Sequence, residues 1–313
     1  MIFVSSSLGI IGRELVFLLV EQGMSVRAMV PNAGAARHMK GWLEEHLDDP
    51  SLAEKAEFAF ATFEDKESIT HAMNGIDSAI LILPSIMDEG EDPVALQRHF
   101  FDAAQKSGVK RMVNLSGSAA NSSIQTTVGG MLAAGETLLQ DTGMEYTHLR
   151  FPLFMLMQNV RVYADMIRTT NQLLLPLGAR QVAMIDARDI AEVAAVALTQ
   201  SGHAGKTYML TGPNAINGND VADALTQTRG VPTEYIPVLP DVARQILEGM
   251  QVPAFLIDDA LALYADGESL DTANVTDAVQ QITGKAPRTI AQFTEDYEWA
   301  WGVPEGQLNG WNE

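Results

Sequence analysis

The sequence predicts an α/β protein: a Rossmann-like three-layer α/β/α domain on a parallel sheet, with a smaller, mostly helical C-terminal substrate lobe. Through the first half, short apolar runs alternate with amphipathic helical stretches, which is typical of parallel strands joined by right-handed crossovers. The first apolar run leads straight into a small-residue turn and a helix. The second half is less regular, and prolines separate several of its helical pieces.

The first twelve residues, MIFVSSSLGIIG, predict the strand, tight turn and helix of a dinucleotide site. Residues 2–4 are apolar without alternation, which suits a strand buried on both faces. We expect Gly9 to let the backbone approach a pyrophosphate and Gly12 to let the helix pack closely on the strand. The free N–H groups at the start of the helix would then hold the phosphates.

The turn departs from both common glycine patterns. Against G-x-G-x-x-G, Ser7 occupies the first glycine position; against T-G-x-x-G-x-x-G, Ser5 and Ser6 replace Thr and Gly. A glycine-rich turn alone is weak evidence, so the rest of the chain must support it.

The remaining elements follow in order. In the first half we expect strands at residues 25–30, 57–62, 78–83, 111–115 and 146–150, and helices at 10–22, 35–47, 68–73, 93–107 and 130–142. In the second half we expect helices at 154–169, 189–199 and 219–227, strands at 173–177 and 206–211, and mostly helical pieces over 233–301. These elements predict a dinucleotide-binding domain over 1–152 and a substrate-binding lobe over 153–313, interleaved with the sheet and without a clean linker.

Composition narrows the class of protein. The 313 residues contain no cysteine, which excludes disulfides, thiolate metal sites and cysteine nucleophiles. A net charge of −20 argues against a nucleic-acid partner. No apolar run reaches the ~18 residues of a membrane span, and Met1 leads directly into a strand, which leaves no room for a signal peptide. We therefore expect a cytoplasmic protein with a small apolar substrate, no membrane partner and no metal; a homodimer is left open.

Seven segments in order resemble the NmrA-like group of atypical short-chain dehydrogenases/reductases. They are SSSLGIIG, VRAMV, FEDKESITHAMNGIDSAILILP, AAQKSGVKRMVNLSGSAA, TGMEYTHLRFPLFMLMQN, DARDIAEVAAVAL and HAGKTYMLTGP. The resemblance implies an NAD(P)-binding protein, either a reductase of small apolar compounds or a redox-sensing regulator without catalysis.

Several positions depart from the family pattern. Pro31 stands where members often carry an Arg for the 2′-phosphate of NADP, with Arg37 and Lys40 as nearby substitutes. We therefore expect NADP or NAD with only a weak preference. On the helix over 130–142 and just before it, Leu132 and Val128 replace the Lys and its Tyr or His partner, so a Tyr–Lys proton relay is absent.

Candidate site residues follow from the expected strand ends and from the resemblance. For the cofactor they are Ser5, Ser7, Leu8, Gly9, Ile10, Ile11, Arg37, Thr62, Leu83 and Pro84; for catalysis Ser116, Ser118 and Tyr163; and for the substrate pocket Asp88, Met131, Phe154, Met155 and Asn159. We expect a packing role for His148, and a helix-surface or capping contact for Glu136.

Three functions remain open. The first is an NAD(P)-binding reductase of a small apolar carbonyl, quinone or enone, with the proton supplied by Ser116, Ser118, Tyr163 or water. The second is a cofactor-independent cyclase, isomerase or lyase on the same scaffold. The third is a non-catalytic dinucleotide-sensing regulator.

Overall fold

The computed structural model describes residues 1–84, 92–121, 126–152, 157–265 and 272–302. These residues form two compact units. Unit 1 comprises the described residues of Met1–Phe151, Ala187–Leu210 and Ala278–Lys285, and unit 2 comprises those of Pro152–Asp186, Thr211–Asp277 and Ala286–Glu313.

Unit 1 is built on a seven-stranded sheet in the order β3-β2-β1-β4-β5-β6-β8, and every pair of neighbours is parallel. The strands are β1 (Ile2–Val4), β2 (Val26–Val30), β3 (Ala56–Phe60), β4 (Ser78–Leu81), β5 (Arg111–Gly117), β6 (Glu145–Phe151) and β8 (Lys206–Met209). The predicted Rossmann-like parallel sheet is confirmed, and the strand expected at 206–211 is its seventh member.

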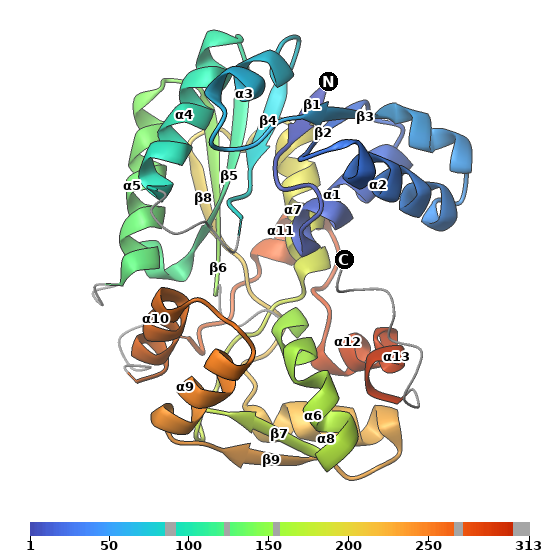
Figure 1. Ribbon diagram of the computed structural model, residues 1–313, viewed down its shortest axis with the longest axis vertical. Helices are drawn as coiled ribbons and strands as arrows, with labels where there is room; N and C mark the ends of the chain where they lie inside the picture. The colour runs from blue at the N-terminus through green and yellow to red at the C-terminus, as the bar shows by residue number, and fades with distance from the viewer. Residues whose placement is uncertain (85–91, 122–125, 153–156, 266–271, 303–313) are drawn as a thin grey trace. The chain divides into compact units, whose positions relative to one another are not determined.

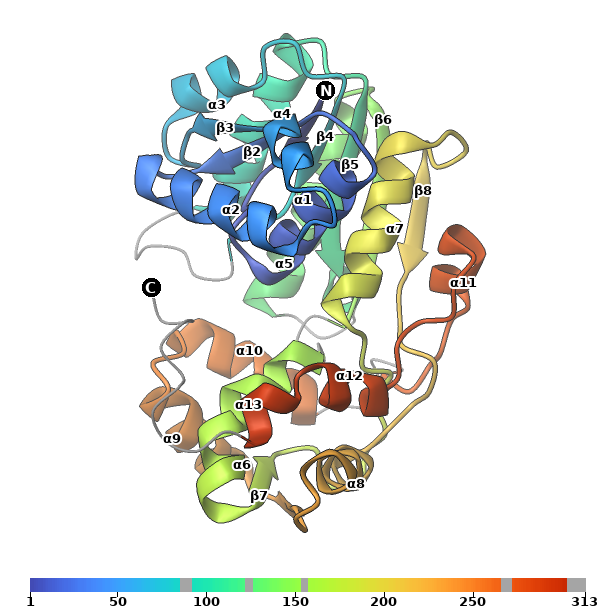
Figure 2. The ribbon, with the colours of Figure 1, turned by 90° about the vertical axis from the view of Figure 1, so that its right-hand side faces the viewer.

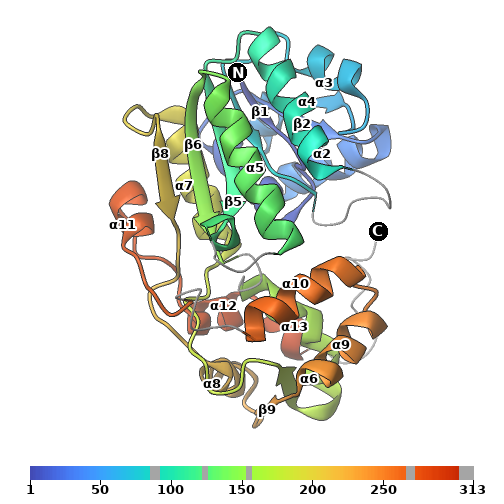
Figure 3. The same cartoon turned by 90° about the vertical axis from the view of Figure 1, so that its left-hand side faces the viewer.

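Helices cover both faces of this sheet. One face carries α1 (Ile10–Glu21), α2 (Ala33–His46) and α7 (Ala187–Thr199) (Figure 2). The other carries α3 (Lys66–Ala72), α4 (Pro93–Lys106) and α5 (Thr127–Asp141) (Figure 3). Short 3-10 helices lie at Pro50–Lys55 and Ser118–Asn121, and α11 (Ala278–Thr283) also belongs to this unit.

The two helical layers explain the apolar run at the start of the chain. Phe3 and Val4 are fully buried, with Phe3 packed near Phe100 of α4. Leu15 and Leu19 of α1 are fully buried as well. Burial on both faces removes the alternation that marks a half-exposed strand.

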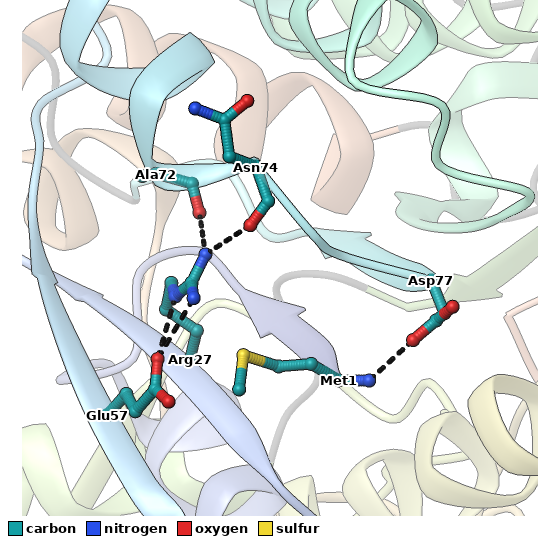
Figure 4. A network of polar contacts seen from close by, with 6 residues as sticks. All are labelled: Met1, Arg27, Glu57, Ala72, Asn74 and Asp77. Carbon is teal, nitrogen blue, oxygen red and sulfur yellow. Dashed lines mark hydrogen bonds and ion pairs between the residues drawn. The ribbon is translucent and has the colours of Figure 1, made fainter.

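Charged groups connect neighbouring segments at the amino-terminal ends of the strands, away from the turns that follow β1 and β2 (Figure 4). Arg27 of β2 donates to the carbonyl oxygen of Asn74 at 2.7 Å and pairs with Glu57 of β3 at 3.0 Å. The Met1 ammonium pairs with Asp77 at 2.6 Å. Ligands of such sheets bind at the carboxyl ends of the strands, so these contacts at the amino ends serve the fold.

Unit 2 contains helices and a two-stranded parallel sheet (Figure 1). Its elements are a 3-10 helix (Met157–Tyr163), α6 (Ala164–Thr170), β7 (Gln172–Leu175), α8 (Gly218–Arg229), β9 (Glu234–Pro237), α9 (Pro240–Gly249), α10 (Ala254–Ala265), α12 (Ile290–Asp296) and α13 (Glu298–Gly302). The helical C-terminal region is confirmed.

One strand of unit 2 was not expected, because 233–301 reads as helical pieces. β9 forms because its partner β7 lies beside it, with Leu173 opposite Tyr235. Tyr235 is buried, and its hydroxyl donates to the carbonyl oxygen of Leu175 at 3.1 Å. A four-residue strand depends on such long-range pairing more than on its own propensity.

Candidate functional site

The turn between β1 and α1 is organised around the backbone of Ser6. Ser6 has φ +41°, in the left-handed region that favours glycine. This conformation lets the carbonyl oxygen of Ser6 accept the N–H of Gly9 at 3.0 Å. A Cβ on Gly12 would overlap that same carbonyl oxygen, so close contact between turn and helix requires glycine at position 12.

The start of α1 is suited to hold an anion. Gly9 is the N-cap residue and offers no side-chain acceptor to the first N–H groups of the helix. Leu8, Gly9 and Ile10 are exposed. Because the first turn of a helix has N–H groups without helical partners and carries a partial positive charge, an exposed and uncapped start can bind a phosphate.

Three consecutive serine hydroxyls hydrogen-bond this turn to the backbone of β2 and of the segment after β4. Ser5 Oγ accepts the N–H of Ile82 at 2.8 Å and donates to its carbonyl oxygen at 3.1 Å. Ser6 Oγ donates to the same carbonyl oxygen at 2.7 Å, and Ser7 Oγ donates to Met29 at 2.6 Å. Ser5 and Ser7 are fully buried, so their hydroxyls hold the turn in shape, and residues 8–10 are its exposed part.

The turn lies at the switch point of the sheet. β1 pairs with β2 on one side and with β4 on the other, and the helices that follow β1 and β4 cover opposite faces, which is where α/β sheets bind ligands. Leu83 and Pro84 follow β4 and are half-buried, and Thr62 follows β3 and is exposed. Most of the predicted cofactor residues therefore follow the carboxyl-terminal ends of neighbouring strands in unit 1.

The segment after β2 offers few groups for a 2′-phosphate. Asn32 uses its side-chain oxygen to cap α2, accepting the N–H of Ala35 at 3.0 Å. Lys40 pairs with Glu54 at 2.6 Å, and this hydrogen bond raises its pKa above the ordinary value. Arg37 is exposed and stays a candidate donor for this role.

A half-buried arginine of β6 and a buried glutamate of α5 form an ion pair. Arg150 donates to Glu136 of α5 through Nε at 2.8 Å and Nη2 at 2.6 Å, and Ser116 Oγ donates to Glu136 at 2.6 Å. Burial raises the pKa of Glu136, but the bonds from Arg150 and Ser116 outweigh it, so this pKa lies below its usual range. The expected surface or capping role of Glu136 is wrong, because the carboxylate is needed to neutralise Arg150 inside the fold.

This arrangement affects the predicted proton donors. The Ser116 hydroxyl is buried and its proton is directed at Glu136, which argues against a role as the acid. Ser118 is half-buried in the 3-10 turn after β5 and stays a candidate. Val128 and Leu132 of α5 are buried, and their side chains carry no proton donor.

The other predicted residues are distributed as follows. Met131 is half-buried on α5, and its carbonyl oxygen accepts from Gln97 at 3.1 Å. Tyr163 belongs to the apolar core of unit 2, where burial raises its pKa to about 12, and Asn159 lies on the same 3-10 helix. Asp88, Phe154 and Met155 lie outside the described residues. Ile11 is buried in the first turn of α1.

Two structural features escaped the sequence-based list of site residues. Ser6 was omitted, although the T-G-x-x-G-x-x-G spacing places it where glycine takes a positive φ. The Glu136–Arg150 pair was missed as well; a charged residue inside a strand that is otherwise apolar, as Arg150 is in β6, was the available signal.

Within the described ranges, no group of three or more His, Cys, Asp or Glu side chains could hold a metal, and no helix is long and apolar enough to cross a membrane.

Known proteins resemble this chain over nearly its full length. A sequence profile of the NmrA-like family matches residues 1–294. The NAD(P)H azoreductase of Xenophilus azovorans is 33% identical over 303 residues, which cover 97% of this chain and 100% of the azoreductase. The NADPH-dependent quinone oxidoreductase of Escherichia coli, solved with NADPH, matches with a TM-score of 0.77 at 21% identity, covering 95% of this chain and 99% of that one.

A second solved structure, the Citrobacter sp. triphenylmethane reductase with NADP(H), matches with a TM-score of 0.76 at 20% identity, covering 94% of this chain and 99% of that one. At these identities the two solved structures establish the fold alone. The profile match and the full-length relative establish the family. The chain therefore belongs to the NmrA-like family of atypical short-chain dehydrogenases/reductases, with the NAD(P)-binding type of Rossmann fold.

Proposed function

We propose that this protein is an NAD(P)H-dependent reductase of a small, apolar, electron-poor acceptor such as a quinone, an azo compound or an enone. The observation that carries the proposal is the exposed, uncapped start of α1 after a close-packed turn at the switch point of the sheet. Gly9 and the N–H groups of Ile10 and Ile11 would hold the pyrophosphate. When bound, the reduced nicotinamide supplies the hydride.

Relatives support a reductase over the two alternatives. A full-length relative at 33% identity is an NAD(P)H azoreductase, and Quinone oxidoreductase 2 of Escherichia coli is 27% identical over 175 residues, 56% of this chain and 59% of that protein. One name refers to azo compounds and the other to quinones, and both classes are conjugated electron acceptors. We carry that class of acceptor to this chain as part of the proposal.

The side chains around β5 and α5 favour an acceptor that does not need an enzymatic acid. Ser116 directs its proton at Glu136, and positions 128 and 132 are apolar. A quinone that receives a hydride becomes a hydroquinone anion, which takes its proton from water, whereas a simple ketone needs a donor beside the developing alkoxide. This difference favours quinones over simple ketones.

We also propose that the preference for NADPH over NADH is weak. Pro31 has no donor for a 2′-phosphate, and Arg37 is the remaining candidate among the cations considered. One charge-assisted hydrogen bond contributes about 1.5–3 kcal/mol, which limits the ratio of the two affinities to about a hundredfold.

The test combines dinucleotide binding with turnover. Wild-type protein should bind NADPH in a calorimetric titration and oxidise it when a benzoquinone or an uncharged azo dye is added. Gly9→Leu should abolish binding, because a side chain at this position would occupy the space of the pyrophosphate. Gly41→Leu is the matched control, since Gly41 lies on α2 with open space around it and should bind as wild type does.

Two outcomes would contradict the reductase. Conversion of a substrate at the full rate by cofactor-stripped protein would favour the cyclase, isomerase or lyase. Tight NADPH binding without oxidation by any quinone, azo dye or enone would favour the dinucleotide-sensing regulator.

A further inference from the structure

Backbone pairing between β1 and β4 ends just where a cofactor would enter. The register pairs Val4 with Ile80, and the N–H of Ser5 donates to the carbonyl oxygen of Ile80 at 3.4 Å. Beyond that point the two strands lead into the turn before α1 and into the Leu83–Pro84 segment. At a switch point these two segments form the two sides of the ligand site.

Side-chain hydroxyls continue the connection past the end of the ladder. Ser5 bonds both backbone groups of Ile82, and Ser6 adds a second donor to the Ile82 carbonyl oxygen at 2.7 Å. The shorter of the two bonds to that oxygen comes from Ser6, at the position where the family pattern has glycine. A glycine at position 6 could make no such bond.

The Ser6 backbone is held in a conformation that serine disfavours. A non-glycine residue in the left-handed region is destabilised relative to glycine, and the hydroxyl bond to Ile82 is a local interaction that offsets part of this cost. The same conformation directs the Ser6 carbonyl oxygen at the Gly9 N–H. One residue thus links the phosphate-binding end of α1 to the segment after β4.

We propose that Ser6 is a positioning residue for the dinucleotide: its hydroxyl fixes the turn before α1 against Ile82, and so sets the site in its binding geometry before the cofactor arrives. This inference rests on the proposed function, because it concerns how NAD(P)H is held. Removing the hydroxyl leaves the phosphate-binding backbone and the Ser5 bonds to Ile82 in place, but it loosens the turn against the Leu83–Pro84 segment. Affinity then falls because binding must order them.

Two substitutions at one position separate positioning from stability. Ser6→Gly removes the hydroxyl and relieves the left-handed backbone, whereas Ser6→Ala removes the hydroxyl and keeps the disfavoured φ. Urea unfolding should therefore show Ser6→Gly close to wild type and Ser6→Ala less stable. The dissociation constant for NADPH should rise about three- to tenfold in Ser6→Gly, the factor that one neutral hydrogen bond corresponds to.

Thr147→Val is the matched control. Thr147 lies on β6 of the same unit, is buried, and donates to the carbonyl oxygen of His203 at 2.8 Å. Its loss should lower stability and leave the NADPH affinity unchanged. Amide hydrogen exchange of the peptide covering Ile82 adds a readout without cofactor: exchange should be faster in Ser6→Gly than in wild type and unchanged in Thr147→Val.

The outcomes distinguish the two proposals. If wild-type protein neither binds nor oxidises NADPH, the proposed function fails. If wild type binds NADPH and Ser6→Gly binds it within twofold of wild type, Ser6 has only a structural role and the inference fails. Unchanged exchange around Ile82 in Ser6→Gly would overturn it as well.

Discussion

Polar side chains of unit 1, all buried except a half-buried arginine, gather between the sheet and α5. Asn114 and Ser116 of β5 and His148 and Arg150 of β6 lie on this face, with Glu136 of α5 bonded to Ser116 and Arg150. Pairing makes the charges tolerable there, because an unpaired ion in the same place would be strongly destabilising. The Arg150–Glu136 pair and the Ser116 bond thus satisfy the charged groups inside this layer.

His148 provides a pH-dependent test at this scale. It is fully buried, and desolvation lowers its pKa from 6.5 to about 4. Because the unfolded chain binds a proton more tightly between these values, the neutral imidazole contributes stability that is present above pH 6.5 and is lost as the pH falls toward 4. Between pH 8 and pH 5.5 we expect wild type to lose about 1 kcal/mol relative to His148→Gln.

Urea unfolding of both proteins at the two pH values gives the comparison, and pH 5.5 keeps the chain above its isoelectric point of about 4.6. An equal loss in wild type and His148→Gln would show that other groups cause the pH dependence.

At the scale of elements, α4 and α5 approach each other through a glycine. A Cβ on Gly135 would overlap the side-chain amide of Gln97, which is buried and donates to Met131. Gly135→Ala should therefore displace Gln97 and cost about 1–3 kcal/mol of unfolding free energy.

Gly130→Ala on the same helix has open space and should be neutral or stabilising by up to about 1 kcal/mol. In a double-mutant cycle, Gln97→Ala should relieve part of the cost of Gly135→Ala, with a coupling of about 1 kcal/mol. Additive effects of the two substitutions would contradict the proposed contact.

At the scale of the whole molecule, charge opposes the proposed cofactor. The chain carries 40 acidic and 20 basic residues, for a net charge of −20. Such a field repels an anionic dinucleotide over distances that salt shortens, from about 30 Å at 0.01 M to about 8 Å at 0.15 M ionic strength.

Stopped-flow association of NADPH should accordingly become several-fold faster as salt is added across this range, while the Michaelis constant of an uncharged quinone stays constant. Slower association with salt would show that the start of α1 and Arg37 dominate the field at the site.

The class of fold and the family could be predicted from local features of the sequence. The seven-stranded sheet takes six strands from the first half of the chain, and the period and length of the apolar runs predicted all six. Its seventh strand, β8, was expected at 206–211. Gly9 and Gly12 located the phosphate turn, because only close backbone approach requires glycine at that spacing. These features are local, so a short window of residues contains them.

The contacts of the polar residues at the site could not be predicted in the same way, because they form between distant parts of the chain. The φ of Ser6, the bonds of Ser5 and Ser6 to Ile82, and the burial of Glu136 against Arg150 all join residues far apart in the chain. A hydroxyl or carboxylate has the same composition whether it faces solvent or a buried partner, and its partner is set by which strands become neighbours. The strand β9 and the role of Glu136 were mispredicted for the same reason: each depends on a contact that folding creates.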